Sequence, residues 1–523
     1  MPILVLPPHT DTAAMAARRR IPPNFAGHTA CLVAKMPNLS PKVAVIGGGI
    51  TGLAAAYYLR KLRPDARITL FESNSRLGGN IRTERREQFV VDAGPDSFIR
   101  AKPPAMELCR ELGLSGELIE PRAGARRVYV ARDGRLQAVP DGLVMGVPTR
   151  LGPLLRSRFL SLSGKLRMVA EAFFPRDFGR GSGDLGDESI AAFMTRRFGK
   201  EAVLRFAAPL LAGIYAGDAD RLSMEATFPL LSALEQQHGS VIWGLLDAQL
   251  ARANRTSNGT RFNRVKAALH WLKALPGDGQ QSPFVSMRGG MGTLISTLAG
   301  RLGETQVRIG QKVDSVQRAS DHWSVFSGGN RLDVDAVVLA PPAHVAANLL
   351  APGTLCDELR AIRYASTATV FLGFHERALA RPLSGAGFIV PPGEGSVLAG
   401  TWITSKWEGR APDGSVLVRA FLGGARATTD VTQEDDQSLV SRSLSELERL
   451  AGKLGTPHFT SVHRHIASNP QPSVGHRARM SRIDAELKAL PGLHLAGAAY
   501  DGVSIPDCIR QARAAVERIA GAA

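Results

Sequence analysis

The sequence predicts an α/β protein in which one parallel-sheet domain is interrupted by insertions, and three observations predict it. Residues 42–72 pass from a short apolar strand through a glycine-rich turn and a helix to a second strand, as in a βαβ unit. From Leu490 the chain again runs strand, glycine-rich loop, helix. A chain of 523 residues is also long enough for two or three domains. Two such fragments at opposite ends therefore predict a single domain that the intervening residues interrupt.

The first βαβ unit is the most clearly marked segment. Its run Lys42–Ile46 is short, apolar and β-branched, which predicts a buried parallel strand. Residues 52–62 carry the Ala, Leu and Tyr content of a helix, and residues 68–71 form the second predicted strand. A nucleotide-binding glycine motif requires this context, in which a strand, a tight turn, a helix and a second strand follow one another within about thirty residues.

The middle of the chain changes character several times. Residues 143–178 are basic and apolar together, and a Gly- and Ser-rich link then leads to a helical stretch at 190–211. Residues 254–263 are polar and predict an exposed loop. A strand-rich meander with a hairpin turn at 327–330 follows, and residues 434–454 return to helical spacing.

Composition limits the classes of partner. The 64 Lys and Arg residues against 47 Asp and Glu residues give a formal net charge of +17, which favours an anionic small molecule, anionic lipid or nucleic acid. A general arginine bias of the organism would explain the same charge without any partner. The basic residues are dispersed and do not cluster with aromatic residues, which argues against nucleic acid.

The cysteines and the N-terminal segment bear on location. Cys31, Cys109, Cys356 and Cys508 lie far apart, so neither a zinc site nor a disulfide framework is expected, and the chain suits a reducing compartment such as the cytoplasm. The sequence contains no uncharged apolar run of 18 or more residues, so no transmembrane helix is expected. Residues 1–40 contain three consecutive arginines and several prolines. They are expected to be a disordered extension, an Arg-rich targeting arm, or the result of a mis-assigned start upstream of Met36.

The glycine turn fits G-x-G-x-x-G. Gly47 permits the tight turn, Gly49 lets the backbone approach a pyrophosphate, and Gly52 lets helix and strand pack closely. The phosphates would then face the N-terminus of the helix. Glu72, at the end of the second strand, is placed to accept hydrogen bonds from a ribose diol. The full set of predicted contacts in this turn is Gly47, Gly48, Gly49, Ile50, Thr51 and Gly52.

Two further segments identify the cofactor by resemblance. "ESNSRLGGNIRT" adds a second glycine turn that a nicotinamide-binding domain does not need, and it resembles the E-x-x-x-R-x-G-G-x-x-x-[ST] extension of the FAD-dependent amine oxidase and porphyrinogen oxidase superfamily. "LAGAAYDGVSIPDCIRQARAAVERI" resembles the closing FAD segment of that superfamily. The resemblance implies FAD as cofactor. The contacts that it implies are Ser73, Arg76, Leu77, Gly78 and Gly79 near the pyrophosphate, and Gly497, Ala498, Val503, Ser504 and Ile505 near pyrophosphate and flavin.

Four other stretches narrow the resemblance. "VDAGPDSFIRAKP", "PLLAGIYAGDADRLSMEATFP", "MRGGMGTL" and "NPQPSVGHRARM" are similar to the protoporphyrinogen oxidase family that makes haem precursors, and the likeness covers nearly everything from Lys42 onward. It implies that Gly94, Pro95, Asp96 and Ser97 approach the flavin ring and that the backbone of Val313 meets the adenine.

The resemblance implies a domain plan. The expected fold is a Rossmann-like FAD-binding domain interrupted by a mixed-sheet substrate domain and by a helical, membrane-associated domain. The expected segments are an N-terminal extension (1–40), the first part of the FAD domain (41–142), the helical insertion (143–283), the second part of the FAD domain (284–345), the substrate domain (346–465) and the closing FAD segment (466–523).

The implied activity is oxidation of protoporphyrinogen IX to protoporphyrin IX in haem biosynthesis, by three two-electron hydride transfers to the flavin with O2 as acceptor. Coproporphyrinogen III stays an alternative substrate because "GPDSFIR" is similar to the bacterial branch that uses it. A flavin-dependent amine oxidase is a more distant alternative. The scarcity of aromatic residues argues against it, because Tyr500 is the single aromatic residue of the closing segment. An FAD-binding protein without activity is another. No nucleophile, general base or metal ligand pattern is present, so neither a catalytic side chain nor a metal is expected.

Cations and flat apolar side chains are expected in the substrate pocket. Arg100 and Arg127 are the candidates for binding the propionates, and Phe371 and Leu372 are the candidates for packing on the macrocycle. A solvated role for the arginines and a plain core role for the two apolar residues stay open. His463, His465 and His476 are expected to be structural.

The insertion carries the membrane prediction. Residues 143–178 hold six basic and two acidic residues among Leu, Phe, Val and Met, which fits an element lying on anionic lipid, although a solvated basic face over an ordinary core explains it too. The expected location is therefore the cytoplasm, with peripheral contact at the inner face of the cell membrane. The expected partners are a porphyrinogen and O2, with ferrochelatase as a candidate and no nucleic acid. The sequence makes no prediction of oligomeric state.

Overall fold

A five-stranded parallel sheet forms the core of one layer of the molecule. The computed structural model describes residues 40–176, 186–253, 271 and 282–521, so the predictions for residues 1–39 and 254–263 lie outside the described residues. The strand order is β12–β2–β1–β16–β22. The strands are β1 (Lys42–Ile46), β2 (Arg67–Glu72), β12 (Gln306–Ile309), β16 (Ala336–Leu339) and β22 (Leu493–Leu495). Because they come from three separate parts of the chain, the prediction of one interrupted parallel-sheet domain is confirmed.

The sheet is buried on both faces, which explains why its strands are continuously apolar. Val43 and Val45 of β1 point into a cluster with helices α1 (Ile50–Leu62) and α18 (Ile505–Ala520), which pack against each other. Ala44 and Ile46 point into the opposite cluster. On that side lie β13 (Ser315–Arg318), β14 (Trp323–Ser327), β15 (Asn330–Val334), α13 (Ala343–Leu349), α14 (Thr354–Arg360) and α17 (His476–Lys488). The predicted hairpin turn at 327–330 joins β14 to β15.

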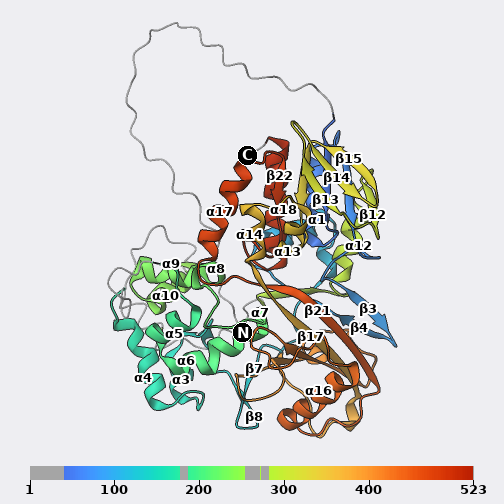
Figure 1. Cartoon of the computed structure of the whole chain (residues 1–523). Helices are drawn as coiled ribbons and strands as arrows, with labels where there is room; N and C mark the ends of the chain where they lie inside the picture. The colour runs from blue at the N-terminus through green and yellow to red at the C-terminus, as the bar shows by residue number, and fades with distance from the viewer. Residues whose placement is uncertain (1–39, 177–185, 254–270, 272–281, 522–523) are drawn as a thin grey trace, which may run out of the picture.

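A seven-stranded mixed sheet forms the second layer (Figure 1). Its order is β21–β17–β20–β19–β18–β7–β8. The strands are β7 (Val128–Arg132), β8 (Arg135–Ala138), β17 (Arg363–His375), β18 (Gly387–Ile389), β19 (Ala399–Trp402), β20 (Ser415–Gly423) and β21 (Phe459–Gln471). The sheet therefore does not coincide with the predicted segment 346–465, since it takes β7 and β8 from earlier residues and β21 runs further. Helix α16 (Asp436–Ala451) covers one face, and Phe89 and Val91 pack on the other.

Smaller strand groups and short helices complete the two layers. The pairs are β3 (Thr83–Arg86) with β4 (Phe89–Asp92), and β11 (Phe284–Met287) with β5 (Phe98–Ile99) and β6 (Leu118–Ile119). The helices are α2 (Pro103–Glu111), α12 (Gly292–Gly300) and α15 (Ile403–Lys406).

The helical insertion lies to one side of both sheets, at the left of Figure 1. It begins with the short pair β9 (Leu143–Val144) and β10 (Val147–Pro148). Its helices are α3 (Leu151–Arg156), α4 (Leu162–Ala170), α5 (Ile190–Phe198), α6 (Lys200–Ala202), the π-helical turn η3 (Val203–Ala207), α7 (Ala208–Tyr215), α8 (Met224–Thr227), α9 (Pro229–His238) and α10 (Val241–Ala253). The predicted helical stretch 190–211 is thus divided among α5, α6, η3 and α7. Within the described residues, no helix is both long enough and apolar enough to cross a bilayer.

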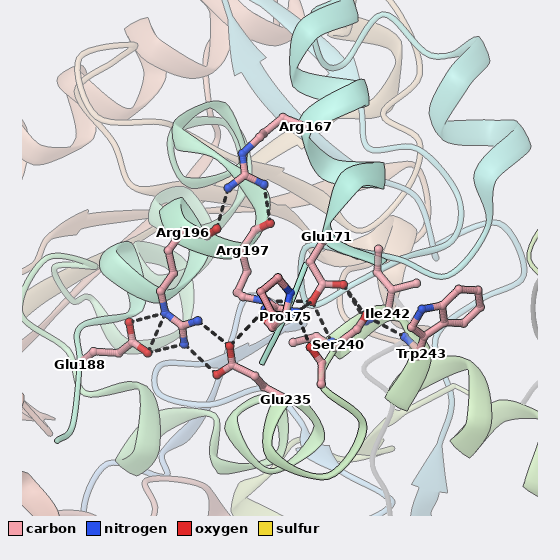
Figure 2. Close-up of polar contacts among 12 residues, drawn as sticks. Arg167, Glu171, Pro175, Glu188, Arg196, Arg197, Glu235, Ser240, Ile242 and Trp243 are labelled. Atoms are coloured by element: carbon pink, nitrogen blue, oxygen red, sulfur yellow. Dashed lines mark hydrogen bonds and ion pairs between the residues drawn. The ribbon is translucent and has the colours of Figure 1, made fainter. Parts of the chain in front are cut away.

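A buried ion-pair network ties the helices of the insertion together (Figure 2). Glu171 and Arg197 are both fully buried and form an ion pair. The Glu171 carboxylate also accepts hydrogen bonds from the Ser240 hydroxyl at 2.7 Å and the Val241 N–H at 2.9 Å, at the N-terminus of α10. Arg167 donates to the carbonyl of Arg197 at 2.8 Å, at the C-terminus of α5. One carboxylate therefore joins three helical segments.

Candidate functional site

The glycine turn between β1 and α1 leaves little or no room for a side chain at Gly47, Gly48 and Gly52. Gly47 has φ +104°, and its N–H donates to the Phe71 carbonyl at 2.8 Å. A Cβ on Gly48 would lie 2.6 Å from Leu77 Cδ2, and one on Gly52 would lie far inside van der Waals contact of the Gly47 carbonyl oxygen. Gly49 caps α1 without a side chain. The first N–H groups of α1 are therefore bare, as phosphate binding requires.

A second glycine turn packs on the first. The Gly78 N–H donates to the Gly48 carbonyl at 2.8 Å, and a Cβ on Gly79 would lie 3.2 Å from Gly49 Cα. Arg76 holds this turn, because its guanidinium donates to the Gly79 carbonyl at 2.6 Å. Burial lowers the pKa of Arg76, but the group stays a cation beside the N-terminus of α1. The two turns and this cation suit a pyrophosphate.

Glu72 lies at the end of β2 and is 5% exposed. Its carboxylate accepts hydrogen bonds from the Gly48 N–H at 2.7 Å and the Asn74 N–H at 2.7 Å. Asn74 Nδ2 also donates to Oε1 at 2.6 Å, so Oε2, which accepts from Gly48, is the oxygen that keeps a lone pair for a ribose hydroxyl. The Gln311 N–H donates to the Glu72 carbonyl at 2.9 Å, which brings Val313, two residues further along the chain, near Glu72. The side chain of Val313 is buried. The structure thus brings Glu72 and Val313 to one side of the turns, and their contacts with ribose and adenine stay predictions.

The segment 94–97 packs beside the second glycine turn. A Cβ on Gly94 would overlap the carbonyl oxygen of Asn80, which follows Gly79. The Asp96 carboxylate accepts hydrogen bonds from Lys406 Nζ at 3.0 Å and Trp407 Nε1 at 2.9 Å. Burial alone raises the pKa of Asp96, but Lys406, Arg419 and the Trp407 hydrogen bond outweigh burial and hold it below its usual range. Asp96 therefore anchors the segment.

The closing segment returns to the same edge of the sheet. Because β22 is parallel to β16 and β1, Gly497 leaves the sheet at the edge where Gly47 leaves β1. Ser504 and Asp507 form a capping box at the N-terminus of α18. Lys102 Nζ donates to the Asp507 carboxylate at 2.8 Å. Ala498, Val503 and Ile505 lie in or beside this loop, and their contacts with FAD stay predictions.

The predicted substrate residues are not brought together. Arg100 forms an ion pair with Glu120 at 2.6 Å, so its charge is already neutralised. Arg127 is exposed and has no ion-pair partner in the part of the chain that the structure describes. Phe371 is buried on the face of the seven-stranded sheet that lies toward Ala93. Leu372 lies on the opposite face, in the core against α16, so its prediction as a substrate contact is wrong. Adjacent residues of a strand point to opposite faces, and this alternation separates the pair.

Three polar side chains that the sequence did not predict as site residues converge on the Ala93 carbonyl oxygen. Thr369 Oγ1 lies 3.2 Å from it, His465 Nε2 lies 3.0 Å and Arg419 Nη2 lies 3.4 Å. Burial, with Arg419 beside it, lowers the pKa of His465 to about 4, so the ring is neutral and its Nε2–H donates. One feature of the sequence could have indicated this cluster: Arg419 is a single charged residue within the apolar strand "SVLVRAFLG".

The comparisons agree with this geometry. The profile of the flavin-containing amine oxidoreductase family matches residues 50–520. Coproporphyrinogen III oxidase of Bacillus subtilis is 34% identical over 91% of this chain and 97% of its own length. Protoporphyrinogen oxidase of Bos taurus is 32% identical over 92% of this chain and 98% of its own length. A crystal structure of a candidate protoporphyrinogen oxidase from Exiguobacterium superposes with TM-score 0.77 and 30% identity, over 92% of this chain and 99% of the other. The chain therefore belongs to the flavin-containing amine oxidoreductase family, in the group of coproporphyrinogen and protoporphyrinogen oxidases, and FAD is its cofactor.

Proposed function

We propose that the protein oxidises coproporphyrinogen III to coproporphyrin III in haem biosynthesis, with O2 as the final acceptor. The net reaction is one porphyrinogen and three O2 giving one porphyrin and three H2O2. The observation that carries the proposal is the 34% identity to a coproporphyrinogen III oxidase over 97% of that enzyme. Protoporphyrinogen IX, which the sequence favoured, is the second candidate, because a protoporphyrinogen oxidase is 32% identical over a similar length.

The chain's own residues position and shield the reaction. FAD, when bound, supplies the hydride acceptor. Asp96 fixes the backbone at 94–97 through Lys406 and Trp407. The buried Phe371 keeps this part of the sheet face dry. At the far end of the same face, α7 packs against β18 and β21.

Cations for the substrate carboxylates come from outside this buried region. Arg127 stays the candidate anchor, since it is exposed at the start of β7 and unpaired within the described residues. Arg100 is less suited, because Glu120 already neutralises it. Ferrochelatase stays a candidate partner, since the porphyrin product must next receive a metal.

The test is oxidation of both porphyrinogens by the purified holoenzyme. Porphyrin fluorescence is followed in air with coproporphyrinogen III and protoporphyrinogen IX in parallel, with putrescine as the amine control. The expected result is a kcat/KM for coproporphyrinogen III at least tenfold above that for protoporphyrinogen IX. The reverse ratio would move the protein to the protoporphyrin route. Oxidation of the amine alone would refute porphyrinogen oxidation altogether.

The helical insertion has an apolar face that fits anionic lipid. Leu162 and Leu166 share one side of α4 and are 72% and 62% exposed, and Phe173 is 79% exposed. Lys165 Nζ donates to the Leu155 carbonyl at 2.8 Å, which brings the exposed Leu155 of α3 beside α4. Exposed basic residues of the same insertion are Arg156, Arg158, Arg176 and Lys200. Apolar side chains with a basic surround are typical of a surface that lies on a membrane.

Vesicle flotation tests this membrane face. We expect the protein to float with phosphatidylglycerol vesicles and not with phosphatidylcholine vesicles, because the basic residues need anionic headgroups. The double variant Leu162→Glu/Leu166→Glu should lose flotation while keeping its FAD. Leu62→Glu is the matched control, since Leu62 is 42% exposed at the end of α1, outside the insertion. Absence of flotation for the unmodified protein would refute the proposed peripheral location.

A further inference from the structure

Arg419 is a buried cation on the site-facing side of the seven-stranded sheet. In register it lies beside Phe371 of β17 and Thr401 of β19, and it is 5% exposed. Its guanidinium carbon lies 4.2 Å from the ring centroid of Phe421 and 5.3 Å from that of Phe371. A substrate carboxylate cannot reach a side chain this enclosed. Arg419 therefore acts on its surroundings through its electric field.

The hydrogen bonding of Arg419 is incomplete. Nη2 donates to the Ala93 carbonyl at 3.4 Å, and Nε finds no acceptor among the residues that the structure describes. Burial lowers the pKa of Arg419 to about 10, although Asp96 and Asp92 oppose the shift. The group is thus still positively charged at neutral pH.

Arg419 and the two ion pairs beside it together carry one net positive charge. Asp92 pairs with Arg410 at 3.4 Å, and Asp96 pairs with Lys406 at 3.0 Å. His465, on the same carbonyl as Arg419, is neutral because burial lowers its pKa to about 4. Burial also raises the pKa of Asp92, which can only increase the excess. An unpaired buried charge is costly, so this site favours a ligand that carries negative charge.

Contacts link Arg419 to the segment 94–97, which is predicted to approach the flavin ring. Gly79 packs on Gly49 at the N-terminus of α1, and Gly94 packs on Asn80, the next residue after Gly79. Ala93, which precedes Gly94, accepts the hydrogen bond of Arg419. Glu72, the predicted ribose contact, accepts a hydrogen bond from the Gly48 N–H of the first turn. A dinucleotide with its phosphates at α1, its adenosine near Glu72 and its flavin at the predicted segment 94–97 would therefore carry that flavin near Arg419.

We infer that Arg419 is the fixed positive charge that stabilises the reduced, negatively charged flavin ring relative to the oxidised ring. A cation in a dry site interacts strongly with charge that appears on a neighbouring group, and it needs no direct contact. The excess charge thereby raises the midpoint potential of the bound FAD. The inference depends on FAD binding and not on which substrate the enzyme oxidises.

The test compares holoenzymes that carry Arg419, Arg419→Met and Arg419→Lys. Methionine keeps an unbranched apolar chain between the two rings, and lysine keeps the charge. The midpoint potential is measured against reference dyes, and the dissociation constant of the flavin–sulfite adduct is measured by absorbance. For Arg419→Met we expect a tenfold weaker adduct and a potential about 30 mV lower, the value of a tenfold change for a two-electron couple. Arg419→Lys should stay within about threefold of the unmodified enzyme. Arg331→Met, at an exposed ion pair with Asp333, should change neither quantity.

Two results would overturn the inference. One is an FAD-loaded Arg419→Met variant whose potential and adduct affinity match those of the unmodified enzyme. The other is an equal shift in the methionine and lysine variants, because charge would then not be the cause. If the methionine variant does not retain FAD, the inference is tested on the unmodified holoenzyme, by the pH at which its reduced FAD becomes protonated. Its reduced FAD should stay anionic at least one pH unit below the value at which free reduced FAD becomes protonated. Equal values for bound and free FAD would refute the inference, and none of these measurements uses a porphyrinogen.

Discussion

Gly52→Ala is expected to strip the protein of most of its FAD, although alanine is the better helix former. Gly52 lies inside α1, where alanine would ordinarily stabilise the helix by about 1 kcal/mol. Here a Cβ would overlap the Gly47 carbonyl oxygen, so α1 must move away from β1. The bare N–H groups of α1 would move with it. Since a hydrogen bond to a charged group contributes about 1.5–3 kcal/mol, misalignment of one such bond weakens FAD binding about tenfold or more.

The measurement is the ratio of flavin to protein after purification, followed by the FAD dissociation constant of the apoprotein. Gly300→Ala is the matched control, because a Cβ there meets nothing within 4 Å and the residue also lies in a helix, α12. The control should keep its FAD. Full FAD occupancy in Gly52→Ala would show that close packing of α1 on β1 is not needed for binding.

Glu171→Ala is expected to lower the free energy of unfolding by about 3–5 kcal/mol, because it removes the carboxylate that hydrogen-bonds the buried Arg197. The charge of Arg197 then keeps a longer ion pair with Glu235, at 3.5 Å, and Arg196 already pairs with that carboxylate. Arg197 is fully buried, and its guanidinium also donates to the carbonyls of Pro175 at 2.8 Å and Gly239 at 2.9 Å (Figure 2). The substitution also removes the acceptor at the N-terminus of α10. The insertion should therefore lose its cooperative packing first.

Urea unfolding measures this effect, with an exposed pair as the reference. Glu107→Ala breaks a surface ion pair between Arg513 and Glu107, whose side chains are 48% and 41% exposed respectively. This substitution should lower the free energy of unfolding by less than about 1 kcal/mol. The double variant Glu171→Leu/Arg197→Met should lose less than the sum of the two single substitutions, because neither charge remains. Equal losses for Glu171→Ala and Glu107→Ala would contradict a central role for the network.

Some of the site depends on local chemistry that is visible in the sequence. Gly47 needs a positive φ, and Gly48 and Gly52 need the absence of a Cβ, so these requirements appear as glycines in a fixed spacing. The strand before them is apolar at every position because both of its faces are buried. Because these patterns are local, the parallel sheet, helix α1 and the acidic end of β2 could be predicted.

The face of the seven-stranded sheet that lies toward Ala93 depends on pairing between distant residues. Thr369, Arg419 and His465 meet Ala93 across 276, 326 and 372 residues of chain, and their alignment follows from the register of β17, β20 and β21. No local pattern specifies which strands become neighbours. The pairing of Arg100 with Glu120 was hidden for a related reason, since it arises where β5 and β6 flank β11.

The sequence by itself therefore determined the two glycine turns, the family and the interrupted parallel sheet, because those rest on backbone conformation and close approach within short segments. Only the tertiary structure decided which cations are neutralised, which face Leu372 occupies and where the excess charge of Arg419 lies. Charge pairing and burial are properties of neighbours in space. Those neighbours become fixed when the seven-stranded sheet brings together strands from distant parts of the chain.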